Sequence, residues 1–125
     1  MQITRLHHVN IRTTQLQAII DWYTQCLGLR LGDRPDFPFG GAWLYAGDIA
    51  VVHLIEVDDT AAIGAEASLK LEHFAFKADG MEAFEARLKP RDEPFRRGEI
   101  TSLGLAQYNI WDPDGNHIHV DFDLV

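Results

Sequence analysis

The stretch that decides the fold lies near the C-terminus, where residues 111–122 read WDPDGNHIHVDF. The segment from Asp112 to Asn116 has the composition of a tight turn, because proline presets one backbone angle, glycine tolerates a positive φ, and aspartate side chains bond nearby backbone N–H groups. Tyr108–Trp111 lead into this turn and His117–Phe122 lead out of it. The pattern therefore predicts a β-hairpin near the end of the chain.

Alternation along the outgoing strand separates its polar and apolar side chains. His117, His119 and Asp121 share one face, and the apolar residues between them share the other. The apolar face is expected to pack in the core. Two imidazoles and a carboxylate in a row suit metal binding or proton transfer better than they suit a core.

Length and composition limit the classes of protein to consider. The chain has 125 residues, of which 46% are hydrophobic, and this predicts one globular domain with a sizeable core. Its formal net charge of −8 argues against nucleic acid or an anionic membrane as partner. Cys26 is the single cysteine, so an internal disulfide is excluded, and no signal-peptide pattern or long apolar run is present. We therefore expect a soluble, cytoplasmic protein.

Periodicity predicts one helix and four strands in the first half of the chain. The predicted strands are Ile3–Ile11, Leu29–Asp33, Ala42–Ala46 and Ile49–Val57. The helix follows Thr13 or Thr14, either of which can cap it, and it ends at Gly28. Its apolar residues recur at helical spacing: Leu16, Ile19, Ile20, Tyr23 and Leu27.

The same pattern then restarts, which indicates an internal repeat. Leu71–Phe76 repeats the form of Leu6–Ile11, 65 positions earlier (71 − 6), and the apolar helix positions recur at the same shift. His119 lies 66 positions after His53 (119 − 53). Each half therefore reads strand, helix and three strands, with a histidine in the first strand and another in the last. Eight strands are enough for two curved sheets that face each other across a cleft.

The repeat makes four histidines candidates for one metal site. If the halves are related by approximate twofold symmetry, equivalent residues on equivalent strands converge between the sheets. A divalent metal ion needs three or four nitrogen, oxygen or sulfur ligands on rigid elements. The predicted metal ligands are His8, His73, His119 and His53. His53 has a second interpretation, as an ordinary polar residue that points at the same pocket.

Two side chains beside His119 are candidates for proton transfer. His117 shares the face of His119 and is interpreted either as a group that supports the ligands from behind or as an acid–base group at the pocket rim. Asp121 is the only carboxylate on that face. It is predicted either to transfer a proton or to bond to a metal ligand.

Strand alternation also predicts a pocket wall. The predicted pocket residues are Asn10, Arg12, Trp43, Tyr45, Phe37, Phe39 and Lys77. The two phenylalanines lie in a loop, Arg34–Gly41, whose glycine pair is predicted to act as a hinge when the loop closes over the cleft. The alternative for the aromatic residues is plain core packing. Arg96 and Arg97 are further candidates for contact with an anionic substrate, but adjacent strand residues cannot both face inward.

Together these motifs resemble the vicinal oxygen chelate superfamily, which includes glyoxalase I, bleomycin-resistance proteins and extradiol dioxygenases. The segments that carry the resemblance are Leu6-His7-His8-Val9, Asp21-Trp22-Tyr23, Cys26-Leu27-Gly28-Leu29, Leu71–Phe76 and Asp112–Val120. The resemblance covers almost the whole chain. It implies an α+β fold in which two tandem βαβββ modules form an open, cupped mixed sheet. We place both modules in a single domain, 1–125, with module one at about 1–58, a linker at about 59–68 and module two at about 69–125.

The chain departs from the family's pattern at one informative place. The family's metal enzymes usually carry a glutamate where this chain has His119, and His53 occupies the other position that such a carboxylate fills. Alternation predicts that Glu56 and Glu72 point away from the metal. A site made only of imidazoles keeps the full charge of the metal ion, which favours Lewis acidity and activation of bound water.

The resemblance leaves three functions open. The first is a divalent-metal-dependent enzyme whose small, oxygen-rich substrate chelates the metal, acting as a lyase or isomerase or as a dioxygenase-like iron enzyme. The second is a protein of the bleomycin-resistance type that sequesters a small molecule without chemistry, and the third is a metal-binding module that serves a partner. Iron, zinc, nickel and manganese are the candidate metals, since sequence does not choose among them. The resemblance also implies a homodimer.

Overall fold

The computed structural model describes residues 1–59 and 70–124. The chain divides into two compact units, Met1–Ile63 and Gly64–Val125, and each unit is described by itself. The predicted linker at about 59–68 lies outside the described residues except for Asp59.

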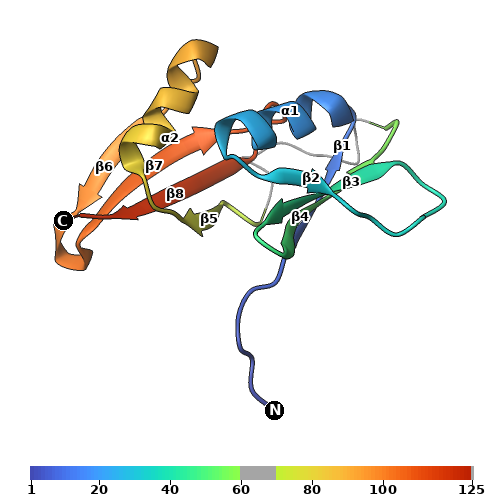
Figure 1. Cartoon of the computed structure of the whole chain (residues 1–125), viewed down its shortest axis with the longest axis horizontal. Helices are drawn as coiled ribbons and strands as arrows, with labels where there is room; N and C mark the ends of the chain where they lie inside the picture. Colours follow the sequence, from blue (N-terminus) through green and yellow to red (C-terminus); the bar gives the residue numbers. More distant parts are fainter. Residues whose placement is uncertain (60–69, 125) are drawn as a thin grey trace. The chain divides into compact units, whose positions relative to one another are not determined.

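The first unit is a four-stranded sheet with one helix packed on it (Figure 1). Its elements in chain order are β1 (Val9–Thr13), α1 (Leu16–Cys26), β2 (Arg30–Gly32), β3 (Gly41–Ala46) and β4 (Ile49–Glu56). The strand order across the sheet is β1-β4-β3-β2, in which β1 runs parallel to β4 and the other pairs are antiparallel. This is the predicted succession of strand, helix and three strands.

The second unit repeats this arrangement with the strand order β5-β8-β7-β6, and β5 runs parallel to β8. Its elements are β5 (Phe74–Lys77), α2 (Met81–Leu88), the short 3-10 turn η3 (Lys89–Arg91), β6 (Arg96–Ile100), the turn η4 (Thr101–Leu103), β7 (Leu105–Trp111) and β8 (His117–Asp123). Asn10 pairs with His53 in the first unit and Ala75 pairs with His119 in the second, so the two histidines occupy equivalent positions. The predicted α+β fold with two βαβββ modules is confirmed.

The helices form because their apolar side chains recur on one face and can be buried on the sheet. The buried residues of α1 are Ile19, Ile20, Trp22, Tyr23 and Cys26. In α2 the buried residues are Phe84 and Leu88. Gly28 ends α1 with a φ of 69°, a left-handed conformation that glycine adopts without steric cost. No helix in the described part of the chain is long and apolar enough to span a membrane.

Several predicted boundaries are wrong. The strand predicted for Ile3–Ile11 begins only at Val9, and the one predicted for Leu71–Phe76 begins only at Phe74. The residues before Val9 are exposed and extend away from the sheet (Figure 1). Neither predicted threonine is the cap residue of α1. Gln15 holds that position, and its backbone N–H donates to the Thr13 hydroxyl oxygen at 3.1 Å.

The turn between β7 and β8 is held together by Asp112. Its carboxylate accepts hydrogen bonds from the backbone N–H groups of Asp114 and Asn116 at 3.0 and 2.9 Å, and from the Asn116 side-chain amide at 2.8 Å. Gly115 has a φ of 80°, and its N–H donates to the Asp112 carbonyl oxygen at 2.8 Å. The predicted hairpin is therefore confirmed, and its turn places His117 at the first position of β8.

Candidate functional site

Three histidine side chains gather on one face of the second unit. His117 and His119 belong to β8, and His73 directly precedes β5, the strand paired with β8. One ring nitrogen from each histidine lies within 4.8 Å of the others. The rings of His73 and His119 stack with their centroids 3.7 Å apart, and His117 meets His119 edge to face at 4.8 Å. The second unit thus brings together two predicted metal ligands and a predicted acid–base residue.

A carboxylate joins this cluster from the residue before His73. Glu72 Oε2 bonds to Nδ1 of His73, and Glu72 Oε1 lies 2.9 Å from Nδ1 of His117. Strand alternation predicted that Glu72 points away from the metal, and it did not predict that the carboxylate bonds to two histidine rings. Side chains alternate only within a strand, and Glu72 lies two positions before β5 begins, so the rule does not apply to it.

Glu72 also decides which ring nitrogens are available for other partners. Hydrogen bonding, first to His73 and then to His117, lowers the pKa of Glu72 and keeps its carboxylate ionised. An ionised carboxylate only accepts hydrogen bonds, so Nδ1 of both rings carries a proton and Nε2 of His73 presents a lone pair. Nε2 of His117 instead donates to the amide oxygen of Asn109 at 2.9 Å. Carboxylate–histidine pairs of this kind orient metal-binding imidazoles in proteins.

The donor set of the second unit fits a divalent metal ion. Burial, assisted by the neighbouring His73 and His117, lowers the pKa of His119, which therefore favours the neutral form that binds metals. Ligand nitrogens around a tetrahedral ion lie about 3.4 Å apart, given metal–nitrogen bonds of about 2.0–2.1 Å. The cluster therefore needs to contract from its present 4.8 Å. The stacked rings must turn until their nitrogens converge, and Nε2 of His117 must leave Oδ1 of Asn109, now 2.9 Å away.

Asp121 follows His119 on the same face of β8. Its Oδ1 atom is buried and has no hydrogen-bond partner among the described residues. A buried oxygen without a partner carries a desolvation cost, which a proton or a ligand donor would relieve. Lys77 pairs with Asp121 in the sheet register but bonds to Asp123 through its ammonium group.

Arg96 is on the face of the histidine cluster, and Arg97 is on the opposite face. The Arg96 guanidinium carbon lies 5.4 Å from the centroid of the Trp111 ring, which stacks on His117 at 5.0 Å. Arg97 bonds to Glu99. The expectation that only one of the two arginines can face inward agrees with this placement.

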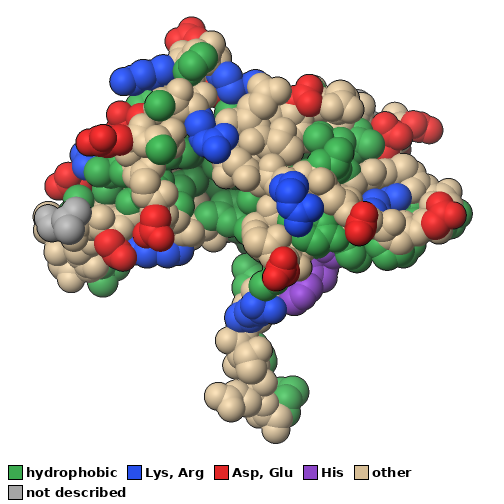
Figure 2. All heavy atoms as spheres, in the orientation of Figure 1, with side chains coloured by type: hydrophobic (Ala, Val, Ile, Leu, Met, Phe, Trp, Pro, Cys, Tyr) green, Lys and Arg blue, Asp and Glu red, His purple; other side chains and the backbone are tan. Residues whose placement is uncertain are grey.

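The first unit carries the other two predicted metal ligands. The rings of His8 and His53 stack with their centroids 3.9 Å apart, and the Trp43 ring stacks on His53 at 4.1 Å. His53 Nε2 lies 3.0 Å from the Ala50 carbonyl oxygen, to which it donates, so Nδ1 is its lone-pair nitrogen. Burial, with a smaller effect of His8, lowers the pKa of His53. Figure 2 shows histidine side chains at the surface beside the N-terminal residues. That all four predicted ligands form one centre stays a prediction.

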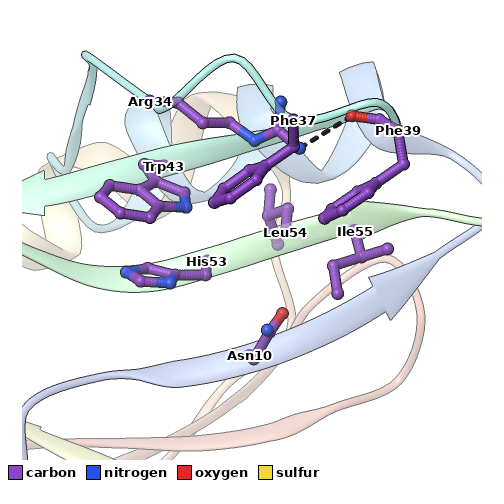
Figure 3. A pocket seen from close by; sticks show the side chains of 8 residues that line it. All are labelled: Asn10, Arg34, Phe37, Phe39, Trp43, His53, Leu54 and Ile55. Carbon is purple, nitrogen blue, oxygen red and sulfur yellow. Dashed lines mark hydrogen bonds between the residues drawn. The ribbon is translucent and has the colours of Figure 1, made fainter.

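An aromatic-walled cavity of about 120 Å³ lies in the first unit (Figure 3). The lining residues are Asn10, Arg34, Phe37, Phe39, Trp43, His53, Leu54 and Ile55. Phe37 and Phe39 stack with their centroids 5.1 Å apart, and the Arg34 guanidinium carbon lies 5.0 and 5.2 Å from these two rings. The cavity therefore combines stacked rings with one cation.

Four of the seven predicted pocket residues line this cavity, namely Asn10, Trp43, Phe37 and Phe39. The other three lie elsewhere. The Tyr45 hydroxyl donates to the Asp33 carbonyl oxygen, and the guanidinium of Arg30 lies over the Tyr45 ring. Arg12 is exposed on β1, and Lys77 belongs to the second unit.

Sequence reasoning missed two side chains, Glu72 and Arg34. Glu72 is adjacent to a predicted ligand, and the late start of the apolar run in β5 was the signal that it lies outside the strand. Arg34 precedes two phenylalanines in one loop, a spacing that permits cation–π contacts. Neither signal is specific without the folded loop.

The sequence matches one family model over most of its length. Residues 5–120 match the model of the Glyoxalase/Bleomycin resistance protein/Dioxygenase superfamily. No curated protein matches the sequence.

Three solved structures with this fold are each less than 20% identical to the chain. A glyoxylase/bleomycin resistance protein/dioxygenase domain from Frankia sp. EAN1pec is 19% identical, with a TM-score of 0.81 over 98% of this chain and 99% of that one. Lactoylglutathione lyase from Agrobacterium tumefaciens is 18% identical, with a TM-score of 0.70 over 97% and 95%. TnmS3, an antibiotic binding protein from Streptomyces sp. CB03234, is 19% identical, with a TM-score of 0.69 over 98% of both chains.

Proposed function

The chain belongs to the Glyoxalase/Bleomycin resistance protein/Dioxygenase superfamily, and from this premise we propose that it is a divalent-metal-dependent enzyme acting on a small, oxygen-rich substrate. The observation that carries the proposal is the cluster of three histidines in the second unit, with Glu72 bonded to two of them. A lactoylglutathione lyase has the same fold, which gives the proposed lyase or isomerase reaction a structural relative.

In this proposal the metal is held by the imidazoles of His73, His119 and His117. Glu72 fixes the tautomer of two of these rings, so that Nε2 is the coordinating nitrogen. The prediction from the repeat adds His8 and His53 as ligands, and we keep both in the proposal. Nδ1 of His53 is the nitrogen that would bind the metal, because Nε2 donates to a backbone carbonyl.

The chemistry follows from what lies beside these ligands. A bound divalent ion supplies Lewis acidity toward the oxygens of a chelating substrate. Asp121 is proposed to accept a proton from the substrate through Oδ1, which has no hydrogen-bond partner among the described residues. Asp121 also returns this proton, because His117 serves as a ligand in this arrangement. The predicted homodimer and cytoplasmic location remain parts of this proposal.

The test is the metal content of protein purified without a metal-affinity tag and without chelator. We expect about one ion of iron, zinc, nickel or manganese per chain, lost after dialysis against EDTA. His73→Ala and His119→Ala should lower the content by tenfold or more. His7→Ala is the matched control for these second-unit variants and should retain the metal, since His7 is exposed and belongs to the first unit, where its ring contacts that of His8.

The same series decides the role of the first unit. If His8→Ala and His53→Ala also lose the metal, all four predicted ligands contribute to one centre. If they retain it, the metal belongs to the second unit alone. No metal in the wild-type protein, even after reconstitution with each of the four ions, would overturn the proposed enzyme.

A second candidate function is sequestration of a small molecule without chemistry. The aromatic-walled cavity of the first unit favours it, and the likeness to an antibiotic binding protein gives it a structural relative. The two candidates differ in the fate of the ligand. A sequestering protein releases the ligand unchanged. It should still bind the ligand after the histidines of the second-unit cluster have been substituted.

A further inference from the structure

We propose that the cavity of the first unit binds a flat, single-ring aromatic anion, with the ring held among the aromatic side chains and the negative charge held by Arg34. This inference rests on the proposed function only in that the chain binds a small molecule. It requires no metal ion, because every described residue that lines the cavity belongs to the first unit and none belongs to the cluster around His73. His53 is the one lining residue that the proposed function also names as a ligand.

The size and walls of the cavity select a ring. Its volume of about 120 Å³ is close to that of an engineered apolar cavity of roughly 150 Å³ that binds benzene. Phe37 and Phe39 form one wall, and their planes differ by only 6°. Trp43 and His53 form another stacked pair, with planes that differ by 14°. Flat walls of this kind favour a flat aromatic ligand over a bulky aliphatic one, because rings gain offset or edge contacts with other rings.

The charge of the cavity selects an anion. Among the lining residues that the structure describes, Arg34 is the one permanently charged side chain and none is a carboxylate. The chain as a whole has a net charge of −8, so the positive charge of Arg34 is opposite in sign to the net charge of the protein. Arg34 Nη2 donates to the Phe39 carbonyl oxygen at 2.9 Å, which leaves further guanidinium N–H groups for a carboxylate or phenolate.

The backbone holds Arg34 and the phenylalanine wall in place. The hinge at Gly40 and Gly41 stays a prediction, and in the structure Gly41 belongs to β3 while the Gly40 carbonyl oxygen accepts a hydrogen bond from the Glu56 N–H at 3.0 Å. A Cβ atom at Gly41 would lie 2.1 Å from the Leu54 carbonyl oxygen and 3.0 Å from Arg34 Nη2. The glycine therefore permits the close approach of loop, strand and guanidinium that shapes the cavity.

A polar side chain on the other side of the cavity, Asn10, can form hydrogen bonds with substituents of the ring. Asn10 points from β1 toward the cavity, across from the loop that carries Phe37 and Phe39 (Figure 3). Its amide both donates and accepts, so a hydroxyl or carbonyl substituent of the ring would find a partner there. The proposed class is thus an aromatic carboxylate or phenolate, with room for a second polar substituent.

The test uses three small probes on the EDTA-treated full chain. Benzoate has the ring and the charge, benzamide has the ring without the charge, and cyclohexanecarboxylate has the charge without the flat ring. Binding is followed by the indole NMR signals of the three tryptophans, which Trp43→Phe assigns. We expect benzoate to shift the Trp43 signal and to leave that of Trp111 unchanged. Both other probes should bind about tenfold more weakly or worse.

A matched pair of arginine variants isolates the role of the charge. Arg34→Gln should weaken benzoate about 10- to 100-fold and change benzamide little. Arg30→Gln removes the same charge from a residue outside the lining, which lies over Tyr45, and should have little effect. Equal losses in both variants, or equal binding of benzoate and benzamide to the wild type, would overturn the inference. Because the wild-type probe comparison needs no variant, a folding defect in Arg34→Gln leaves the inference testable.

The outcome is separable from that of the proposed enzyme. Benzoate binding in EDTA supports this inference whether or not the protein later takes up a metal. Benzoate that binds only after metal is restored, with a shift of Trp111 instead of Trp43, overturns it and supports the metal centre. No binding in either state overturns the inference and leaves the metal measurement to decide the proposed function.

Discussion

The two units have the same βαβββ plan but carry different chemistry at equivalent positions. In the first unit Trp43 pairs with the last-strand histidine His53, and in the second unit Asn109 pairs with His119. The tryptophan extends a stack of rings beside an aromatic cavity. The asparagine contacts a cluster of histidines that is joined by the carboxylate of Glu72.

The comparison shows on which face of the sheet the side chains of the two modules differ. On the buried face the two units agree, since Leu44 pairs with Val52 in one and Ile110 with Ile118 in the other, and all four side chains are buried. Packing restricts that face because cavities and overfilled cores both cost stability. The opposite face is less completely buried, since Trp43 and Asn109 are both half-buried, and there the two units carry a ring wall and a polar cluster on the same scaffold.

The largest effect on stability is expected on the buried face, where both units carry apolar side chains. Leu44→Ala and Ile110→Ala each remove a side chain that is at most 1% exposed, and each should lower the free energy of unfolding by about 2–5 kcal/mol. Urea unfolding followed by circular dichroism measures the loss. Leu31→Ala and Leu103→Ala are the controls, because these leucines are exposed, and should change stability by less than about 0.5 kcal/mol. A loss below about 1 kcal/mol in either buried variant would contradict the shared core.

The next effect tests the carboxylate that, among the described residues, bonds to histidines in the second unit and not in the first. Glu72→Gln removes the anion that fixes Nδ1–H on two rings, and metal affinity should fall about 10- to 100-fold. Competition with a chelator of known affinity measures the change. Glu56→Gln, at the end of β4 in the first unit, is the matched control and should leave affinity unchanged. An unchanged affinity in both variants would show that Glu72 does not position the rings.

A smaller effect on stability is expected from substitutions in the two hairpin turns, and it should differ between them. Asp112→Ala removes three accepted hydrogen bonds from the β7–β8 turn and should cost about 1–2 kcal/mol of unfolding free energy. Asp48→Ala, in the turn between β3 and β4, should cost less than about 0.5 kcal/mol, because Asp48 is an exposed turn residue. Thermal unfolding of the two variants side by side makes the comparison. Equal losses would mean that the Asp112 bonds add no net stability.

The smallest effect is on the pH dependence of stability, and both units should share it. Burial lowers the pKa of His53 and of His119 from the ordinary value of 6.5. The unfolded chain therefore binds more protons than the folded one just below that pH, and stability should fall as pH drops from about 7.5 to 5. Urea titrations of EDTA-treated protein should show this slope, and His53→Gln and His119→Gln should each flatten it. Stability that rises toward pH 5 would be incompatible with these two shifts.

Much of the fold could be predicted from the sequence because its signals are local. The turn at Asp112 and the helix start at Met81, 65 positions after Leu16 (81 − 16), follow from turn chemistry and helical periodicity. The first strand was placed too early, at Ile3 instead of Val9. Apolar alternation shows that a segment can form a strand, but only a neighbouring strand supplies the hydrogen bonds that make it one.

The candidate site was predictable to a lesser degree. Alternation placed His117, His119 and Asp121 on one face, because they belong to a single strand. It did not predict the bonds of Glu72, which lies in the segment before β5, and it did not reveal Arg34 as a cavity residue. Both side chains reach their partners from outside a strand, where no period relates position in the chain to direction in space.

The sequence by itself determined the repeated module, the hairpin turn and the family, since each depends on residue types at short, regular spacing. Only the tertiary structure decided that Glu72 bonds to a histidine 45 positions further along the chain as well as to its neighbour. It also decided that Arg34 covers two phenylalanine rings and that Trp43 stacks on His53. These contacts depend on how strands and loops pair across the fold. Local sequence propensities do not describe such pairing. The hydrogen bonds and ring contacts that define the site form only after the strands and loops have paired.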